Sequence, residues 1–269
     1  MESPITIGLW PSEAPTSNGL SGTENNIEGK IDNISKGELY AYLPKNVNHL
    51  TPAVLIFPGG GFSLLQFENH GVKTAQWLVE HDIAAIIVKY RLPNQHYEIP
   101  LEDAQQAMTQ TKLHAKTWRI DPQKIGAIGF SIGGNTVARL GNLSPEAIKP
   151  KFTALFYPVL SMMDGLTHVP TREKLIGSSA SENLYISLSA ERSVNKATSP
   201  CFLVLCNDDP IAPPVASLLF YEELLKCKIK SALHIFAKGG HGWGLYSDFR
   251  YATICKELLL DWIKSRVQD

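Results

Sequence analysis

The chain has 269 residues, of which 44% are hydrophobic and 19% are charged. This composition supplies a large core and shows no signature of intrinsic disorder. The 25 basic and 26 acidic side chains leave a net charge of −1. Such a balance argues against a nucleic-acid binder, which needs an excess of basic residues, and against a polybasic membrane anchor.

No apolar run in the sequence approaches the roughly 20 residues that span a bilayer. The longest apolar runs, 53–57 and 83–88, have the length of strands. The first residues lack the basic region and the long apolar region of a secretory signal. The cysteines form no C-x-x-C pair, which favours free thiols over a disulfide or a metal site. We therefore expect a cytoplasmic protein with no membrane partner.

Residues 1–36 are rich in Gly, Ser, Asn and Pro, which predicts an irregular arm on the surface. Beyond residue 50, short apolar runs alternate with segments of helical period. The predicted strands are 38–43, 53–57, 83–89, 124–130, 152–157, 201–206 and 231–236. The predicted helices are 72–81, 101–118, 134–141, 215–227 and 251–266. This alternation predicts a single α/β domain over 1–269, with a mostly parallel central sheet and helices on both faces.

Residues 158–199 interrupt the alternation, because they follow a predicted strand and show little periodicity. A stretch of this length inside a compact domain usually has a function. We expect it to form a short lid or cap insertion above a site. A purely structural insertion is the alternative.

The sharpest motif is Gly129-Phe130-Ser131-Ile132-Gly133, a G-x-S-x-G that an apolar run enters and a helix-like segment follows. A serine at such a strand-to-helix turn is typical of a nucleophile elbow, in which the hydroxyl stands clear of the sheet. The following helix directs backbone N–H groups toward any oxyanion beside the serine. We expect Ser131 to be a nucleophile; an inert serine in a tight turn is the alternative.

The second motif, Pro58-Gly59-Gly60-Gly61-Phe62, comes directly after the predicted strand 53–57. Glycines allow backbone N–H groups to approach a ligand closely. In a serine hydrolase this loop supplies the second oxyanion donor, and the residue after the nucleophile, here Ile132, supplies the first. Gly60 and Gly61 are the candidate donors; a flexible turn is the alternative.

A serine nucleophile needs a base, because a free hydroxyl barely ionises near neutral pH. Of the eight histidines, His241 alone lies in a glycine-rich stretch between the last predicted strand and the last predicted helix. The glycines around it let the imidazole reach over the edge of the sheet. We interpret the other histidines as surface or packing residues. None has the spacing of a metal-binding pair, so no metal site is expected.

A third group has to orient the imidazole and stabilise it when it is protonated. Asp208 and Asp209 both follow the predicted strand 201–206. We favour Asp209, because the Asp-Pro-x-x-Pro pattern that it begins holds it at a fixed turn, and Asp208 is the alternative. The order Ser131, Asp209, His241 is that of α/β hydrolases.

Motifs between about residues 50 and 250 make the chain resemble an α/β hydrolase, of the branch of small carboxylesterases related to acetyl-xylan esterases. In chain order they are Phe57-Pro58-Gly59-Gly60-Gly61-Phe62, Val88-Lys89-Tyr90-Arg91-Leu92-Pro93, Asp121-Pro122 before Ile125-Gly126, Gly129-Phe130-Ser131-Ile132-Gly133-Gly134, Asp208-Asp209-Pro210 and Gly240-His241-Gly242-Trp243-Gly244-Leu245. The resemblance implies an α/β-hydrolase fold. It also implies a nucleophile, acid and base at Ser131, Asp209 and His241, and oxyanion glycines at Gly60 and Gly61.

The sequence departs from the family pattern at two positions. Related lipases have His before the triple glycine, whereas this chain has Pro58, so the hydrogen bonds of that histidine are absent. The nucleophile is followed by Ile132, where relatives commonly have a small residue. A bulky side chain there narrows the acyl side of the site.

These residues predict a serine esterase that hydrolyses small acyl esters, with acetylated carbohydrates as one candidate class, and that needs no cofactor. Phe62, Trp243 and Tyr246 are candidates to line the substrate pocket, although aromatic residues of this kind are also ordinary core. One alternative is a serine peptidase of the prolyl-oligopeptidase type, whose large extra domain we do not expect here. Another is an inactive hydrolase fold that serves as a small-molecule receptor. The oligomeric state stays open.

Overall fold

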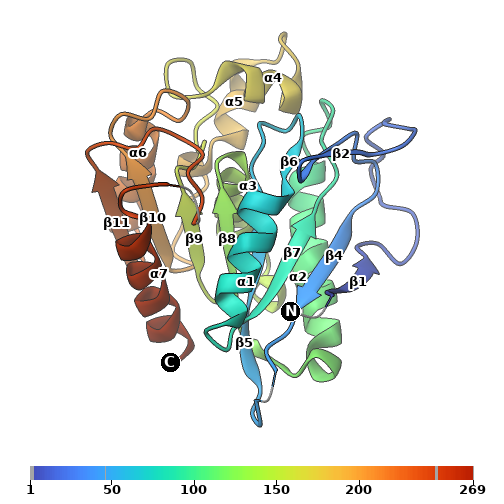
Figure 1. The fold of residues 1–269 in the computed structure, drawn as a ribbon. Helices are drawn as coiled ribbons and strands as arrows, with labels where there is room; N and C mark the ends of the chain where they lie inside the picture. Colours follow the sequence, from blue (N-terminus) through green and yellow to red (C-terminus); the bar gives the residue numbers. More distant parts are fainter. Residues whose placement is uncertain (1–2, 46, 246–247, 269) are drawn as a thin grey trace.

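A computed structural model describes residues 3–45, 47–245 and 248–268 (Figure 1). In the described part, the central sheet has eight strands in the order β1-β4-β7-β5-β8-β9-β10-β11. The strands from β7 to β11 along this order run parallel. At one edge β4 pairs antiparallel with β7, and β1 pairs antiparallel with β4. Their bounds are β1 (Ile5–Gly8), β4 (Glu38–Tyr42), β5 (Thr51–Phe57), β7 (Ala84–Lys89), β8 (Ile120–Phe130), β9 (Thr153–Phe156), β10 (Cys201–Cys206) and β11 (Ser231–Phe236).

Helices cover both faces of the sheet, and the alternation of side chains along each strand divides the core into two layers. Val54 and Ile56 point to the layer that α1 and α7 close, whereas Leu55 and Phe57 point to the layer that α2, α3 and α6 close. Figure 1 shows α1 and α7 on the near face. The helices are α1 (Lys73–Val79), α2 (Ile99–Trp118), α3 (Ile132–Leu143), α6 (Pro214–Lys226) and α7 (Ala252–Val267). Burial on both faces explains why the parallel strands are continuous apolar runs.

The N-terminal arm is more regular than its composition predicts, so the expectation of an irregular segment over 1–36 is wrong in part. Strand β1 joins the central sheet beside β4, and β2 (Asn25–Ile27) and β3 (Lys30–Asp32) form a second sheet with β6 (Leu65–Gln66). The side chain of Asn18 donates to the carbonyls of Ile34 and Leu92. Pairing with distant strands, which local composition does not reveal, orders this arm.

The insertion over 158–199 lies between β9 and β10 and contains α4 (Val169–Ile176), α5 (Glu182–Leu188) and the short 3₁₀ turn η3 (Ala190–Arg192). It stands at the end of the molecule where the parallel strands finish (Figure 1). Two asparagines of α3 fasten both its start and its second half. Asn135 donates to the carbonyls of Leu160 and Leu188, and Asn142 donates to the carbonyl of Ala190.

Two shorter elements complete the path. A single π-helical turn, η1 (Phe67–Val72), precedes α1, so the predicted helix 72–81 is regular only between Lys73 and Val79. A 3₁₀ turn, η2 (Glu146–Ile148), follows α3. Among the described residues, no helix is long and apolar enough to cross a membrane.

We expect Gly126→Ala to destabilise the fold. A Cβ at this position of β8 would lie 2.2 Å from the ring of Phe152, which is fully buried. Overpacking of this kind lowers the free energy of unfolding by about 1–3 kcal/mol, which urea denaturation measures. Gly8→Ala in β1 is the matched control, because its Cβ would meet its nearest neighbour at 3.7 Å. Equal midpoints for both variants would contradict the close contact.

Candidate active site

Ser131 lies at the sharp turn between β8 and α3, with φ 54° and ψ −121°. The turn requires close backbone approach on both sides. A Cβ on Gly129 would lie 2.3 Å from the carbonyl oxygen of Gly133, and a Cβ on Gly133 would lie 2.3 Å from that of Phe57. The strand, the serine and the helix therefore have the geometry of a nucleophile elbow, and the glycines of the G-x-S-x-G motif are sterically required.

The structure brings Ser131, His241 and Asp209 into one chain of hydrogen bonds. The Ser131 hydroxyl donates to Nε2 of His241 over 2.8 Å, and Nδ1–H of that ring donates to Oδ2 of Asp209 over 2.7 Å. An ionised carboxylate only accepts, so Asp209 fixes the proton on Nδ1 and leaves Nε2 free to receive the serine proton. The three residues follow the carboxyl ends of β8, β11 and β10, which the parallel register places at one edge.

The two neighbouring aspartates have different partners. Asp209 has a fully buried side chain, and its second oxygen accepts the N–H groups of Ile211 and Ala212 at 2.8 and 2.9 Å. Asp208 is exposed and accepts the N–H groups of Gly239 and Gly240. Asp209 thus contacts the base, whereas Asp208 holds the glycine loop that carries it.

The oxyanion candidates lie beside the serine. Gly60 and Gly61 adopt φ angles of +141° and +63°, and a Cβ on Gly60 would lie 2.1 Å from the carbonyl oxygen of Leu64. Both glycines line the same hollow as Ser131 and His241. Ile132 occupies the first position of α3, where the backbone N–H has no acceptor inside the helix. The three residues thus lie where oxyanion donors are expected, and their role stays a prediction.

A hollow of about 410 Å³ opens at this edge of the sheet. The residues around it come from the glycine loop after β5, the π-helical turn, the insertion, and the loops that carry Asp209 and His241. They include Gly60, Gly61, Gln66, His70, Ser131, His168, Thr171, Lys174, Ile211 and His241. Nδ1 of His168 lies 2.8 Å from Oγ1 of Thr171. Burial and the nearby His241 lower the pKa of His168. The insertion therefore contributes residues to the wall, and its role as a lid or cap stays a prediction.

The structure corrects the expectation that Phe62 and Trp243 line the pocket. Both are at least 96% buried in the hydrophobic core, Phe62 against the edge of Tyr90 and Trp243 stacked on Phe249 at 4.0 Å. Local packing turns each ring inward, and the loop glycines next to them form the wall instead. Tyr246, the third aromatic candidate, lies outside the described residues.

Two residues near the site escape the sequence patterns. Tyr157 directly follows β9, has a positive φ of 37° and sets its ring edge against the His241 ring, with centroids 4.8 Å apart. His70 is buried in the π-helical turn, not placed on the surface. A signal for Tyr157 exists, because it ends a strand next to the strand that carries the serine. His70 has no local signal, because its burial depends on distant parts of the chain.

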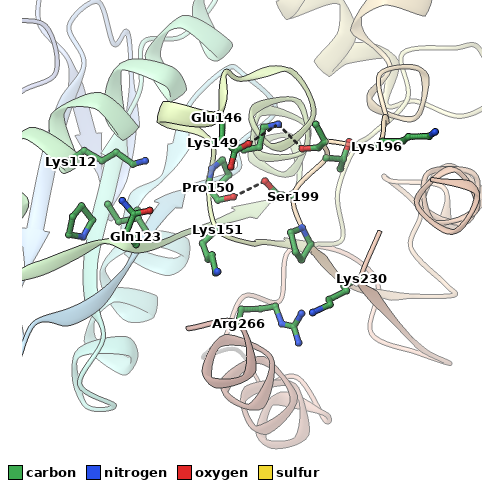
Figure 2. A pocket seen from close by; sticks show the side chains of 15 residues that line it. Lys112, Gln123, Glu146, Lys149, Pro150, Lys151, Lys196, Ser199, Lys230 and Arg266 are labelled. Atoms are coloured by element: carbon green, nitrogen blue, oxygen red, sulfur yellow. Dashed lines mark hydrogen bonds and ion pairs between the residues drawn. The ribbon is translucent and has the colours of Figure 1, made fainter. Parts of the chain in front are cut away.

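A second hollow lies at the opposite edge, where β8 to β11 begin (Figure 2). Its wall is rich in cations, namely Lys112, Lys149, Lys151, Lys196, Lys230 and Arg266. The hydroxyl of Ser199 there donates to the Pro150 carbonyl, and no histidine lines the wall.

In the ranges that the structure describes, no group of three or more His, Cys, Asp or Glu side chains suits a metal ion. The geometry for nucleophilic chemistry is thus found at the first hollow.

Comparison with known proteins gives a consistent result. A family model of the alpha/beta hydrolase fold matches residues 54–244. An acetylxylan esterase of Xylanibacter ruminicola is 31% identical over 234 residues, which are 86% of this chain and 48% of that protein. The chain thus spans about half the length of this relative.

Solved structures extend the similarity over nearly the whole chain. An acetyl ester-xyloside bifunctional hydrolase from Caldicellulosiruptor lactoaceticus superposes with a TM-score of 0.82 at 29% identity, and the match covers 98% of this chain and 96% of that one. A carboxylesterase from Lactobacillus plantarum shares the fold with a TM-score of 0.74 at 22% identity, covering 91% and 97%. The elbow, the strand order and these matches together establish that the chain belongs to the alpha/beta hydrolase family.

Proposed function

We propose that this chain is a serine carboxylic-ester hydrolase that acts on small acyl esters. The observation that carries the proposal is the hydrogen-bonded chain of Ser131, His241 and Asp209 at the wall of a hollow. Nucleophile, base and orienting carboxylate in this mutual geometry are suited to acyl transfer through an acyl-enzyme. The similarity to an acetylxylan esterase and to an acetyl ester-xyloside hydrolase supports the same reaction class.

Acetylated carbohydrates are the substrate class that we propose. The hollow of about 410 Å³ suits a short acyl group on a small alcohol. Gln66, His168 and Thr171 in its wall provide polar groups for sugar hydroxyls. The cytoplasmic location and the absence of nucleic-acid and membrane partners stay predictions from the sequence.

In the proposed first step, Ser131 Oγ attacks the ester carbonyl while His241 takes its proton. The N–H groups of Gly60, Gly61 and Ile132 stabilise the negative charge that develops on the carbonyl oxygen. The imidazolium then gives its proton to the departing alcohol, and Asp209 stabilises the ring while it is charged. The product of this step is an ester between the acyl group and Ser131.

The second step repeats this chemistry with water. His241 takes a proton from a water molecule, which attacks the acyl-enzyme carbonyl, and the same N–H groups stabilise the second oxyanion. Collapse of the intermediate returns the proton to Ser131 and releases the carboxylic acid. The enzyme thus returns to its starting protonation state.

We expect Ser131→Ala to reduce kcat for p-nitrophenyl acetate by about 10⁵- to 10⁶-fold, because the covalent step is lost. A fluorophosphonate probe should label the unmodified protein at Ser131 and leave the variant unlabelled.

Dipeptidyl anilides should be poor substrates in comparison with acetyl esters and acetylated xylo-oligosaccharides. Preferential anilide cleavage would favour the peptidase, and absence of both turnover and labelling would favour the receptor.

Asp209→Asn should lower kcat by about 10³- to 10⁴-fold, because an amide does not hold the proton on Nδ1 of His241. Asp208→Asn is the matched control, since Asp208 accepts N–H groups of the loop and does not touch the base among the described contacts. Its amide oxygen still accepts those bonds, so we expect a much smaller loss. Steady-state kinetics on one acetyl ester compares the two variants, and equal losses would contradict the separate roles.

The proposed reaction creates positive charge on His241, so neighbouring imidazoles have to stay neutral. Burial, together with the nearby His241, lowers the pKa of His70 to about 3 and also lowers that of His168. Between pH 3 and the ordinary value of 6.5, the unfolded chain binds a proton at His70 that the folded protein does not bind. Acid therefore favours unfolding through this group.

Stability should accordingly fall as the pH is lowered from 6.5 toward 3, with His70 contributing up to about 1.4 kcal/mol per pH unit. His70→Gln removes this titration, so the difference in unfolding free energy between the unmodified protein and the variant should shrink as the pH falls. Urea denaturation at pH 7, 6 and 5 measures it. Parallel curves for the two proteins would show that His70 titrates alike in both states.

A further inference from the structure

A buried imidazole lies between the loops that carry the proposed catalytic groups. His70 is 97% buried and lies on the π-helical turn Phe67–Val72. Its ring stacks on Phe130, the residue before Ser131, with centroids 4.7 Å apart and planes 14° apart. Single π-helical turns frequently occur at functional sites. Here the turn places the nearly fully buried His70 at the wall of the hollow.

One nitrogen of this ring holds the glycine loop over residues 58–62, which we call the oxyanion loop. Nδ1 of His70 accepts the backbone N–H of Gly59 over 3.1 Å. Gly59 precedes the two candidate oxyanion glycines and packs tightly on the nucleophile, since a Cβ there would lie 2.8 Å from Cβ of Ser131. Because Nδ1 accepts and the ring is neutral, the single ring proton is on Nε2. The imidazole thus offers Nδ1 as an acceptor to the loop that contains Gly59, and Nε2–H as a donor on the opposite side of the ring.

The other nitrogen reaches, through Tyr157, the glycine-rich loop over residues 238–244 that carries His241, which we call the base loop. Nε2–H of His70 donates to Oη of Tyr157 over 3.1 Å, and the same oxygen accepts the N–H of Gly244 over 2.9 Å. Gly244 follows His241 in the glycine-rich loop, and the Tyr157 ring also packs against the His241 ring. The path from Gly59 through His70 and Tyr157 to Gly244 therefore joins two loops that are far apart in the sequence.

We propose that His70 is a positioning residue that, through Tyr157, holds the oxyanion loop and the base loop in register with Ser131. The inference rests on the proposed esterase function and deepens it. Oxyanion donors act only when they lie about 2.7–3.1 Å from the developing charge, so a loop that shifts slightly loses its effect. Both loops contain glycines at positive φ, which offer little intrinsic rigidity, so a buried polar link supplies the order that their sequence lacks.

A neutral imidazole suits this position better than a charged side chain would. His241 becomes positively charged during the proposed reaction, and a second cation so close would oppose that change. A neutral ring still offers one acceptor and one donor on opposite sides. The Gly59 N–H needs the acceptor, and the Tyr157 hydroxyl needs the donor. Tyr157 matches it, because burial raises the pKa of its hydroxyl and keeps it neutral.

His70→Phe tests the proposal, because it keeps a flat ring on Phe130 and removes both hydrogen bonds. We expect kcat to fall by about 10²-fold, the scale of a misplacement near 1 Å, with a much smaller change in KM. His81→Phe is the matched control. His81 also packs on an aromatic ring, that of Trp77, and bonds to a backbone carbonyl, but it lies after α1 and away from the site. We expect its kcat to match that of the unmodified protein.

Two conservative variants separate the links. His70→Asn places an amide group near the position of Nδ1 and should retain the bond to Gly59, whereas His70→Gln reaches the position of Nε2 and should retain the bond to Tyr157. Each should recover part of the kcat that His70→Phe loses. Tyr157→Phe should also lower kcat, and combining it with His70→Phe should add little, because both act in one path.

The rate of fluorophosphonate labelling at Ser131 provides a readout that needs no ester substrate. Labelling should slow in parallel with kcat in the His70→Phe and Tyr157→Phe proteins. If the unmodified protein is labelled but cleaves no ester, the proposed function fails, and the labelling rates still test the positioning role. An unchanged kcat and labelling rate in folded His70→Phe would overturn the proposal. So would losses in KM alone, or losses that His81→Phe shares. If His70→Phe does not fold, the His70→Asn, His70→Gln and Tyr157→Phe variants replace it. Unchanged kcat and labelling rates in all three would overturn the proposal in the same way.

Discussion

The geometry around Ser131 depends on the close fit of the first turn of α3 against the ends of β5 and β8. Backbone carbonyls of Phe57 and Gly133 occupy the space that a side chain would need at Gly133 and Gly129. This contact forces Ser131 into its unusual backbone conformation and aims its hydroxyl away from the sheet. Residues held in sparsely populated conformations persist only where the surroundings determine them, and here the tight packing of the strand and the helix does so.

Much of the site follows from the sequence because strand ends are visible in it. Ser131, Asp209 and His241 each follow an apolar run, and parallel strands deliver such positions to one edge. Glycine patterns then distinguish functional loops from ordinary turns. The order of these positions along the chain identifies the family, and the comparisons with known proteins confirm it.

The remaining features depend on contacts between distant segments. Phe62 and Trp243 stand in functional motifs, yet their rings fill the core, and nothing in the local pattern distinguishes an inward ring from one at the wall. His70 is buried by Phe130 and Tyr157, which lie 60 or more residues away in the sequence. Strand β1 is ordered by pairing with β4 across a polar arm. Tertiary packing decides each of these, and local propensity carries no information about it.

The attachment of the insertion to α3 links part of the wall of the hollow to the helix that begins beside Ser131. Asn135 and Asn142 project from the same helix that begins beside Ser131, and they hold the carbonyls of Leu160, Leu188 and Ala190. On the proposed function, we expect a bulky alcohol group that displaces this segment to shift the helix behind the serine as well. Selectivity among esters should then include the turnover number and not only binding.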